Sequence, residues 1–184
     1  MDEADAVGVI GPGGRGLAAE FDLENEIEVQ MGTLGKAIGA SGGYLAGSRV
    51  LIDFLVNRAR SFIFSTAPPA ATAAAAMAGV EIIASDEGAK RRQRLWENIK
   101  FLAKEIVPLR GEHPASAIVP LVIGDEGETL RIAELLWKKN FWVPAVRYPT
   151  VAKGEARLRL SLSAEHTKEQ IRNLGNGFQK FPKN

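Results

Sequence analysis

Short apolar runs separated by glycine-rich turns characterise the first third of the sequence. Runs of this kind, bounded by turn-forming residues, predict buried strands. A stretch with apolar positions at helical spacing, 49–59, predicts a helix that connects two of them. The predicted strands are AVGVI at 6–10, IEVQM at 27–31, GGYLAG at 42–47 and SFIFS at 61–65.

Two long helices are predicted in the middle of the chain. The first is the alanine-dense stretch that follows Pro68 and Pro69, since prolines are tolerated at the start of a helix. The second follows the basic run KRRQR at 90–94, and we expect Pro108 to end it. Its apolar positions recur at steps of 4, 3 and 4 residues and form one stripe: Leu95, Ile99, Leu102 and Ile106.

The last part has a compact pattern of strands and helices. AIVPLVIG at 117–124 predicts a strand, and Asp125 with Glu128 resembles a capping box before a helix. FWVPAVRYP at 141–149 is expected to be extended. ARLRLSLSA at 156–164 alternates, so its leucines share one face of a strand and its arginines and serines the other. A last amphipathic helix is predicted to start at Thr167, with Gln170 completing its box.

These patterns predict an α/β fold in three parts. Residues 1–70 form part of an α/β domain, 71–107 form connecting helices, and 108–184 form a small C-terminal α+β domain. About four strands precede the connecting helices, which is fewer than an enclosed sheet usually has. We therefore expect the first part to be incomplete.

Composition narrows the class of protein. The 184 residues are 46% hydrophobic and 24% charged, with a net charge of +1, so no strong field favours nucleic acid or an anionic membrane. The absence of cysteine excludes disulfides, thiol catalysis and cysteine-bound zinc, and fits a reducing compartment. The histidines, His113 and His166, lie far apart in sequence, which argues against a histidine metal site. The N-terminus lacks a basic segment followed by an apolar one, so the sequence does not indicate a signal peptide.

Candidate chemistry centres on Lys36, which lies between a glycine and an alanine where a flat ligand could approach it. A lysine amine can attack a carbonyl, and the hydroxyl of Thr33 with nearby glycine N–H groups could hold a phosphate. These features together suggest pyridoxal 5'-phosphate, which also needs an acid opposite its pyridine nitrogen. Asp2 and Glu3 are candidates for that acid. The alternative is an exposed loop lysine among turn glycines.

Several ordered motifs resemble a known family. TLGKAIGASG at 33–42 matches the lysine signature of class II pyridoxal-phosphate aminotransferases. DEADAVGVIGPGGRG, SGGYLAG, SFIFSTAPP and RYPTVAKGEARLRLSLSAEHT resemble segments of the α-oxoamine synthases, so the resemblance runs from residue 2 to 167. It implies an aspartate-aminotransferase-like fold of type I, with 1–70 the remnant of the large cofactor-binding domain. It also implies a cytoplasmic homodimer.

The resemblance implies an acyltransferase. Members condense an amino acid with an acyl-CoA and release carbon dioxide. RYPTVAKG favours the branch that joins L-alanine to a pimeloyl thioester in biotin biosynthesis. Two alternatives stay open: another oxoamine synthase, of the glycine C-acetyltransferase or serine palmitoyltransferase type, or a catalytically silent structural partner.

The resemblance also assigns roles to individual residues, and it implies no metal site. Lys36 would bind the cofactor covalently and move protons. Asp2 would pair with the pyridinium nitrogen, Thr33 would bind the phosphate, and Ser65 and Thr66 would reach the phosphate in the neighbouring subunit. Arg147 and Arg159 would bind the substrate carboxylate. The alternative for both arginines is an exposed side chain with no substrate. The alternation of the last strand equally predicts this for Arg159, and a position at a strand end predicts it for Arg147.

The sequence departs from the family in two places. Asp5 stands where the family has a histidine that hydrogen-bonds the phenolic oxygen of the cofactor. A carboxylate there would repel a phenolate unless one of the two held a proton. Family members also have a long stretch before the position of Asp2. We therefore expect a C-terminal portion of a synthase that is inactive by itself.

Overall fold

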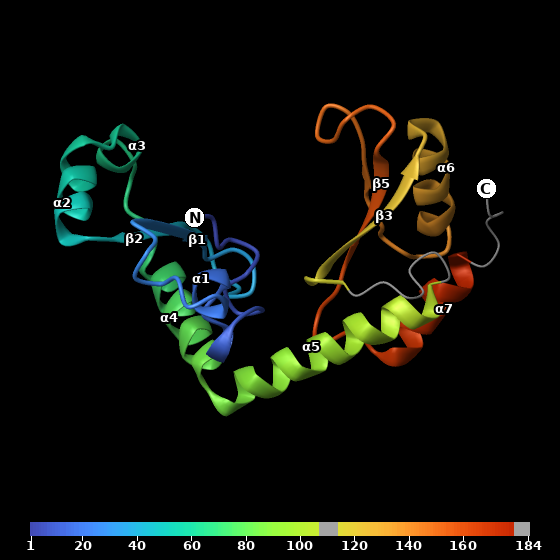
Figure 1. Ribbon diagram of the computed structural model, residues 1–184, viewed down its shortest axis with the longest axis horizontal. Helices are drawn as coiled ribbons and strands as arrows, with labels where there is room; N and C mark the ends of the chain where they lie inside the picture. Colours follow the sequence, from blue (N-terminus) through green and yellow to red (C-terminus); the bar gives the residue numbers. More distant parts are fainter. Residues whose placement is uncertain (107–113, 179–184) are drawn as a thin grey trace. The chain divides into compact units, whose positions relative to one another are not determined.

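The computed structural model describes residues 1–106 and 114–178. Pro108, the expected end of a helix, and His113 lie outside the described residues. The chain divides into two compact units, Met1–Arg92 and Gln93–Asn184 (Figure 1). None of the described helices combines the length and the apolar content that a membrane span requires.

Unit 1 is built around a two-stranded antiparallel sheet. Strand β1 pairs with β2 in a register that runs from Val29↔Gly47 to Thr33↔Gly43, and β1 also forms a parallel bridge from Met31 to Asp2. The elements of this unit are η1 (Pro12–Gly14), α1 (Leu17–Glu20), β1 (Val29–Thr33), β2 (Gly43–Gly47), α2 (Arg49–Arg58), α3 (Arg60–Ile63), α4 (Ala70–Ala84) and the start of α5 (Asp86–Glu105).

Two of the predicted strands in this unit are wrong. Residues 6–10 form consecutive turns, in which the N–H groups of Val9 and Ile10 both donate to the Ala6 carbonyl, at 2.9 and 2.8 Å. Gly8 adopts φ 84° there, which a strand does not allow. Residues 61–65 overlap α3 instead, because Phe64 N–H donates back to the Arg60 carbonyl at 3.0 Å. Unit 1 therefore has two strands before α4 rather than about four.

The predicted helix at 49–59 is confirmed as α2, which begins after Ser48. The Ser48 hydroxyl accepts a hydrogen bond from Leu51 N–H at 3.3 Å and so caps the helix. Neither α2 nor α3 has a buried residue. Large apolar side chains stand exposed on this pair of helices, and we call them the α2–α3 apolar face: Val50, Phe54, Phe62 and Phe64.

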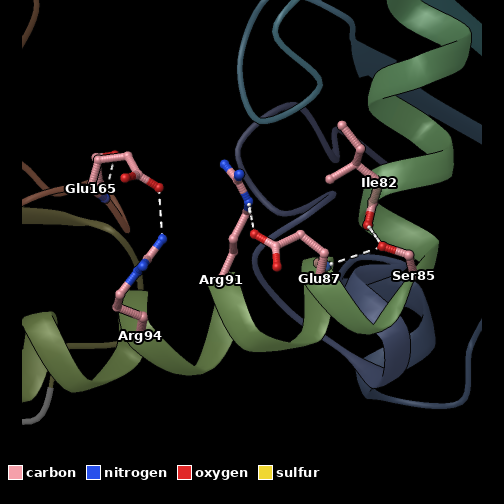
Figure 2. A network of polar contacts seen from close by, with 8 residues as sticks. Ile82, Ser85, Glu87, Arg91, Arg94 and Glu165 are labelled. Carbon is pink, nitrogen blue, oxygen red and sulfur yellow. Dashed lines mark hydrogen bonds and ion pairs between the residues drawn. The ribbon is translucent and has the colours of Figure 1, made fainter.

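The two predicted long helices are α4 and α5, and Ser85 forms the corner between them (Figure 2). Pro69 immediately precedes α4, as the tolerance of proline at a helix start predicts. The Ser85 hydroxyl donates to the Ile82 carbonyl at 2.7 Å and accepts from Gly88 N–H at 3.3 Å. One side chain therefore satisfies a backbone group at the end of α4 and another at the start of α5.

Unit 2 is a three-stranded antiparallel sheet with the strand order β3-β5-β4. Helix α6 contacts β3 and β5, and α7 lies along α5, where Lys168 and Arg172 approach the ring of Phe101 at 5.0 and 5.6 Å (Figure 1). The extended stretch predicted at 141–149 contains one short strand. The elements are β3 (Ile118–Gly124), α6 (Glu126–Trp137), β4 (Ala145–Val146), β5 (Ala156–Ser161) and α7 (Lys168–Phe178).

The core of unit 2 confirms the predicted stripe of α5, whose four members are at most 8% exposed: Leu95, Ile99, Leu102 and Ile106. Leu158 and Leu160 of β5 are also buried, as the alternation predicts. The apolar spacing of the helix predicted after Asp125 would also place Trp137 in the core, and this expectation is wrong. Trp137 is the last residue of α6 and is 57% exposed, packing edge-on against the exposed Trp142 at 4.8 Å.

The two predicted capping boxes differ in outcome. Thr167 and Gln170 exchange both bonds, at 3.1 and 2.9 Å, and form a complete box before α7. Asp125 accepts from Glu128 N–H at 2.7 Å, but the Glu128 carboxylate binds Arg131 instead of closing the box. The guanidinium of Arg131 accordingly holds the pKa of Glu128 below its usual range.

Candidate functional site

Lys36 lies in the loop between β1 and β2. The base of this loop is closed by Leu34 N–H, which donates to the Gly42 carbonyl at 2.9 Å. Within the loop, Ala40 N–H donates to the Leu34 carbonyl at 2.7 Å and Gly39 N–H to the Lys36 carbonyl at 3.0 Å. Gly39 has φ 75°, where glycine carries no strain. The backbone is therefore folded tightly and presents Lys36 outward.

Two glycines allow other segments of unit 1 to approach this loop closely. A Cβ added at Gly79 of α4 would lie 2.2 Å from the Ile38 carbonyl oxygen. A Cβ added at Gly8 would lie 2.6 Å from the Cβ of Ala37. Ile38 itself is 7% exposed. The loop is thus held between the 6–10 turns and α4, and its backbone has little freedom to shift.

An amine, a carboxylate and an unpaired hydroxyl gather at this loop. The Nζ of Lys36 lies 2.7 Å from the Oδ2 of Asp5, and both side chains are partly exposed. The Oγ1 of Thr33 is buried and has no hydrogen-bond partner among the described residues. A buried hydroxyl without a partner costs free energy, so its position marks a place where a bound group could hydrogen-bond.

Asp2 and Glu3, the two candidate acids, have different environments. Asp2 is exposed at the edge of β1, and its Oδ1 accepts the N–H two residues on at 2.8 Å. Glu3 is 2% exposed, and its two oxygens accept from Leu17 N–H at 2.8 Å and Ala18 N–H at 2.7 Å. The Glu3 carboxylate thus caps α1 with both of its oxygens, which favours Asp2 as the acid opposite a cofactor; that role stays a prediction.

Arg147 and Arg159 both belong to unit 2 and both are exposed. Arg159 lies on β5 between the buried Leu158 and Leu160, and its backbone N–H donates to the Pro144 carbonyl at 2.9 Å. Arg147 directly follows β4. Among the described residues neither guanidinium forms an ion pair, so each can receive an anionic group from solution.

Ser65 and Thr66 lie exposed on the segment between α3 and α4. The Ser65 hydroxyl donates to the Ser61 carbonyl. No hydrogen bond within the described part of unit 1 joins either side chain to Lys36 or Thr33. Their predicted role in a neighbouring subunit stays a prediction.

Comparison with known proteins assigns the family. The family model for aminotransferase class I and II matches residues 1–177. The chain belongs to the aminotransferase class I and II family. The match confirms the family that the motif around Lys36 indicated.

Individual members of this family resemble the chain closely. An 8-amino-7-oxononanoate synthase from Bacillus pumilus is 40% identical over 173 residues, 93% of this chain and 44% of that enzyme. A serine palmitoyltransferase structure from S. paucimobilis with a bound PLP–myriocin aldimine has a TM-score of 0.89 at 28% identity, over 97% of this chain and 45% of that one. An 8-amino-7-oxononanoate synthase structure from Francisella tularensis has a TM-score of 0.81 at 27% identity, over 97% and 53%.

These comparisons confirm the predicted aspartate-aminotransferase-like fold, to which this mixed α/β chain contributes part. The chain spans less than half the length of the curated relatives it matches, 44% in the first of them. The division at 70 and 107 stays a prediction.

The residues at the Lys36 loop fit a phosphorylated aldehyde. Lys36 offers the amine that condenses with an aldehyde, and the orphaned hydroxyl of Thr33 can donate to a phosphate oxygen. The Lys36 side chain is 43% exposed, so an aldehyde can reach its amine from solution. Asp5 adds a carboxylate in direct contact with the amine.

Tyr44 is a neighbour of the site that the sequence analysis missed. It lies opposite Gly32 in the β1–β2 register, and a Cβ at Gly32 would come 2.4 Å from the Tyr44 oxygen. The aromatic side chain therefore covers the glycine. Burial, and then the charge of Glu3, raise the pKa of the Tyr44 hydroxyl above its ordinary value. A glycine in a strand beside an aromatic partner is the signal that could have found this contact.

The basic run KRRQR on α5 has internal partners. Arg91 binds Glu87 at 2.8 Å and Arg94 binds Glu165 at 2.7 Å (Figure 2). Arg92 donates to a backbone carbonyl of α4 at 2.8 Å. These partners favour a structural, solvated helix face over a site for the phosphates of coenzyme A.

A separate cavity of about 320 Å³ lies within unit 2, between α5, β5 and α7. Its wall is mostly apolar, with Asn140, His166 and Gln170 among the polar members, and it includes neither Arg147 nor Arg159. The His166 Nδ1 accepts from Ser163 N–H at 3.1 Å, a bond within the turn that precedes α7. No group of three potential metal ligands occurs among the described side chains.

Proposed function

We propose that this chain carries the lysine and the substrate arginines of a pyridoxal-phosphate-dependent acyltransferase of the α-oxoamine synthase type. The reaction is the decarboxylative condensation of L-alanine with a pimeloyl thioester to 8-amino-7-oxononanoate, in biotin biosynthesis. The contact of Lys36 with Asp5, on the loop that follows the unpaired Thr33 hydroxyl at the end of β1, carries the proposal. The names of the relatives, 8-amino-7-oxononanoate synthases at about 40% identity, support the choice of reaction.

Each residue of the Lys36 loop has a task in this proposal. Pyridoxal 5'-phosphate supplies an aldehyde and an electron-withdrawing ring that stabilises negative charge at the amino acid Cα. Lys36 binds the aldehyde carbon and moves protons at that Cα. Thr33 donates to the phosphate. Asp2, whose carboxylate is exposed beside β1, keeps the ring nitrogen protonated.

The arginines of unit 2 bind the substrate carboxylate. A planar guanidinium grips a carboxylate with two parallel hydrogen bonds, and both Arg147 and Arg159 have exposed heads without an ion-pair partner among the described residues. We extend the proposal to a cytoplasmic homodimer in which the exposed Ser65 and Thr66 reach the cofactor phosphate of the partner.

The relatives favour the L-alanine branch over the serine branch. The curated relatives, which are 38–43% identical to the chain, are named 8-amino-7-oxononanoate synthases, whereas the two solved structures, one of each enzyme, are 28% and 27% identical to it. The TM-scores of 0.89 and 0.81 measure a backbone that both enzymes share. The names of the curated relatives therefore support the L-alanine branch.

Borohydride trapping tests the cofactor site. The chain is mixed with pyridoxal 5'-phosphate, reduced, digested and mapped by mass spectrometry, and we expect the phosphopyridoxyl group on Lys36. Lys36→Ala abolishes that label, while Lys90→Ala, which removes an exposed lysine of α5, leaves it unchanged. Thr33→Val weakens the cofactor's apparent affinity. Label spread evenly over surface lysines would refute the site.

Thiol release tests the reaction. Pimeloyl-CoA and palmitoyl-CoA are each offered with L-alanine, L-serine or glycine, and the free thiol of coenzyme A is measured. Any release is expected to be greatest with pimeloyl-CoA and L-alanine, and the absence of release from every pair would agree with the expectation that this chain is inactive by itself. Preference for palmitoyl-CoA with L-serine would transfer the chain to the other branch. A labelled Lys36 without thiol release from any pair would identify a cofactor-binding but silent chain.

A further inference from the structure

The contact between Asp5 and Lys36 calls for an explanation beyond stability. The carboxylate and the ammonium are 2.7 Å apart, with 55% and 43% of their side chains exposed. Ion pairs this exposed contribute about 0–1 kcal/mol, so the fold gains little from this one. The two residues come from different segments, the first turns of unit 1 and the β1–β2 loop.

The surrounding backbone fixes this contact. Ala6 next to Asp5 is 4% exposed, and Ile38 beyond Lys36 is 7% exposed. The close approach of Gly8 to the loop joins the two segments directly. The carboxylate is therefore presented to the amine by buried neighbours on both sides.

The other carboxylates of the first segment are engaged elsewhere. Asp2 accepts a backbone N–H at 2.8 Å. Glu3 is buried and accepts the two N–H groups at the start of α1. Asp5 is the acid of this segment whose oxygen lies in contact with the Lys36 nitrogen.

The chemistry at Lys36 needs a proton acceptor and then a proton donor. An ammonium nitrogen has no lone pair, so it must lose a proton before it bonds to a carbonyl carbon. The carbonyl oxygen then leaves as water and needs two protons. A positioned side chain that takes and returns a proton accelerates such steps.

We propose that Asp5 is the catalytic proton carrier for the condensation of Lys36 with an aldehyde, an inference that rests on the proposed function. Asp5 takes one proton from the ammonium, and the freed amine bonds to the carbonyl carbon. A second proton passes from nitrogen to the former carbonyl oxygen. Asp5 returns its proton to that hydroxyl, the C–O bond breaks and water leaves. The resulting C=N nitrogen keeps one proton and its positive charge beside the Asp5 carboxylate.

Timed trapping tests this role with two aldehydes. Pyridoxal 5'-phosphate and pyridoxal, which lacks the phosphate, are each quenched with borohydride at intervals, and the modified Lys36 peptide is quantified. At pH 7 we expect Asp5→Asn to slow modification about tenfold with both aldehydes, near the lower end of general acid–base effects. Asp5→Glu retains most of the rate, because it keeps a carboxylate.

The matched control is Asp53→Asn, which removes an exposed carboxylate that pairs with Arg49 on α2. It is expected to leave the Lys36 rate unchanged. At high pH, where hydroxide removes the proton of an ammonium group without help from a side chain, the gap between the wild type and Asp5→Asn narrows. Circular dichroism confirms that each variant is folded.

The outcomes separate this inference from the proposed function. A rate for Asp5→Asn equal to or above the wild-type rate overturns the inference, because the carboxylate would then only restrain the amine. Slower modification by pyridoxal in Asp5→Asn supports it, even if pyridoxal 5'-phosphate shows no preference for Lys36. That last result would refute the cofactor site alone.

Discussion

The substitution Gly79→Ala in α4 tests how tightly α4 packs against the Lys36 loop. In a helix interior, alanine is more stable than glycine by about 0.5–1 kcal/mol, so helix propensity alone predicts stabilisation. At Gly79, however, the new Cβ would lie 2.2 Å from the Ile38 carbonyl oxygen. The loop must move by roughly 1 Å to restore an ordinary contact, since interiors are close-packed.

The expected magnitude follows from two costs and one gain. Overpacking a filled site costs about 1–3 kcal/mol. Exposing part of the Ile38 side chain, which is now 7% exposed, adds up to about 2 kcal/mol. After the propensity gain is subtracted, we expect unit 1 to lose about 1–3 kcal/mol of unfolding free energy.

Two probes measure this change. The tryptophans, Trp96, Trp137 and Trp142, all lie in unit 2, so their fluorescence follows that unit in a urea titration. Far-UV circular dichroism follows the helices of both units. We expect the variant to show an earlier transition by circular dichroism than by fluorescence.

Gly127→Ala is the matched control. It lies in α6, where the nearest atom to a new Cβ is the end of the Asp125 side chain at 3.3 Å. This substitution is expected to be neutral or stabilising. A Gly79→Ala protein as stable as the wild type, or more stable, would show that propensity outweighs the contact and would refute the reasoning.

Three further predictions concern two buried polar side chains, Asn98 and Glu3, and the Tyr44 hydroxyl. Asn98 is 2% exposed and donates to the carbonyls of Ser163 and His166 at 3.2 and 2.8 Å. Asn98→Ala is expected to cost about 1.5–3 kcal/mol in urea unfolding of unit 2, and no cost would show that water replaces both bonds. Glu3→Gln removes one of two acceptors for α1, so we expect a loss of about 1–3 kcal/mol at pH 7; equal urea midpoints would count against it. The pKa of Tyr44 is raised in the folded state. Its contribution to the free energy of unfolding is therefore fully present below the unfolded pKa of tyrosine, near 10, and is lost as pH rises through the folded pKa. Tyr44→Phe is expected to flatten this decline in urea titrations from pH 8 to 11, and an unchanged slope would assign the decline to other groups.

Helices were predictable from the sequence because their signals are local. The stripe from Leu95 to Ile106 and the box of Thr167 and Gln170 depend on spacing within one segment. The run at 61–65 was misassigned, because alternating aromatics favour a strand only when a partner strand is present. In unit 1 its backbone bonds to itself instead and forms α3.

The chemistry of the site was predictable only in part. Lys36 and Thr33 are three residues apart in sequence, so one motif contains both. The contact of Asp5 with Lys36 joins distant segments and depends on the close approach at Gly8, which no local pattern encodes. Glu3 shows the same limit, because its burial under α1 is a consequence of tertiary packing.

The α2–α3 apolar face has a colloidal consequence. Its members Val50 and Phe64 are 80% and 75% exposed, while the chain has a net charge of +1 and a pI of about 8.0. Long-range repulsion between molecules is weakest when net charge is near zero, and exposed apolar side chains then determine association. In dilute buffer the purified chain is therefore expected to cluster most near pH 8 and to disperse as acid raises its positive charge.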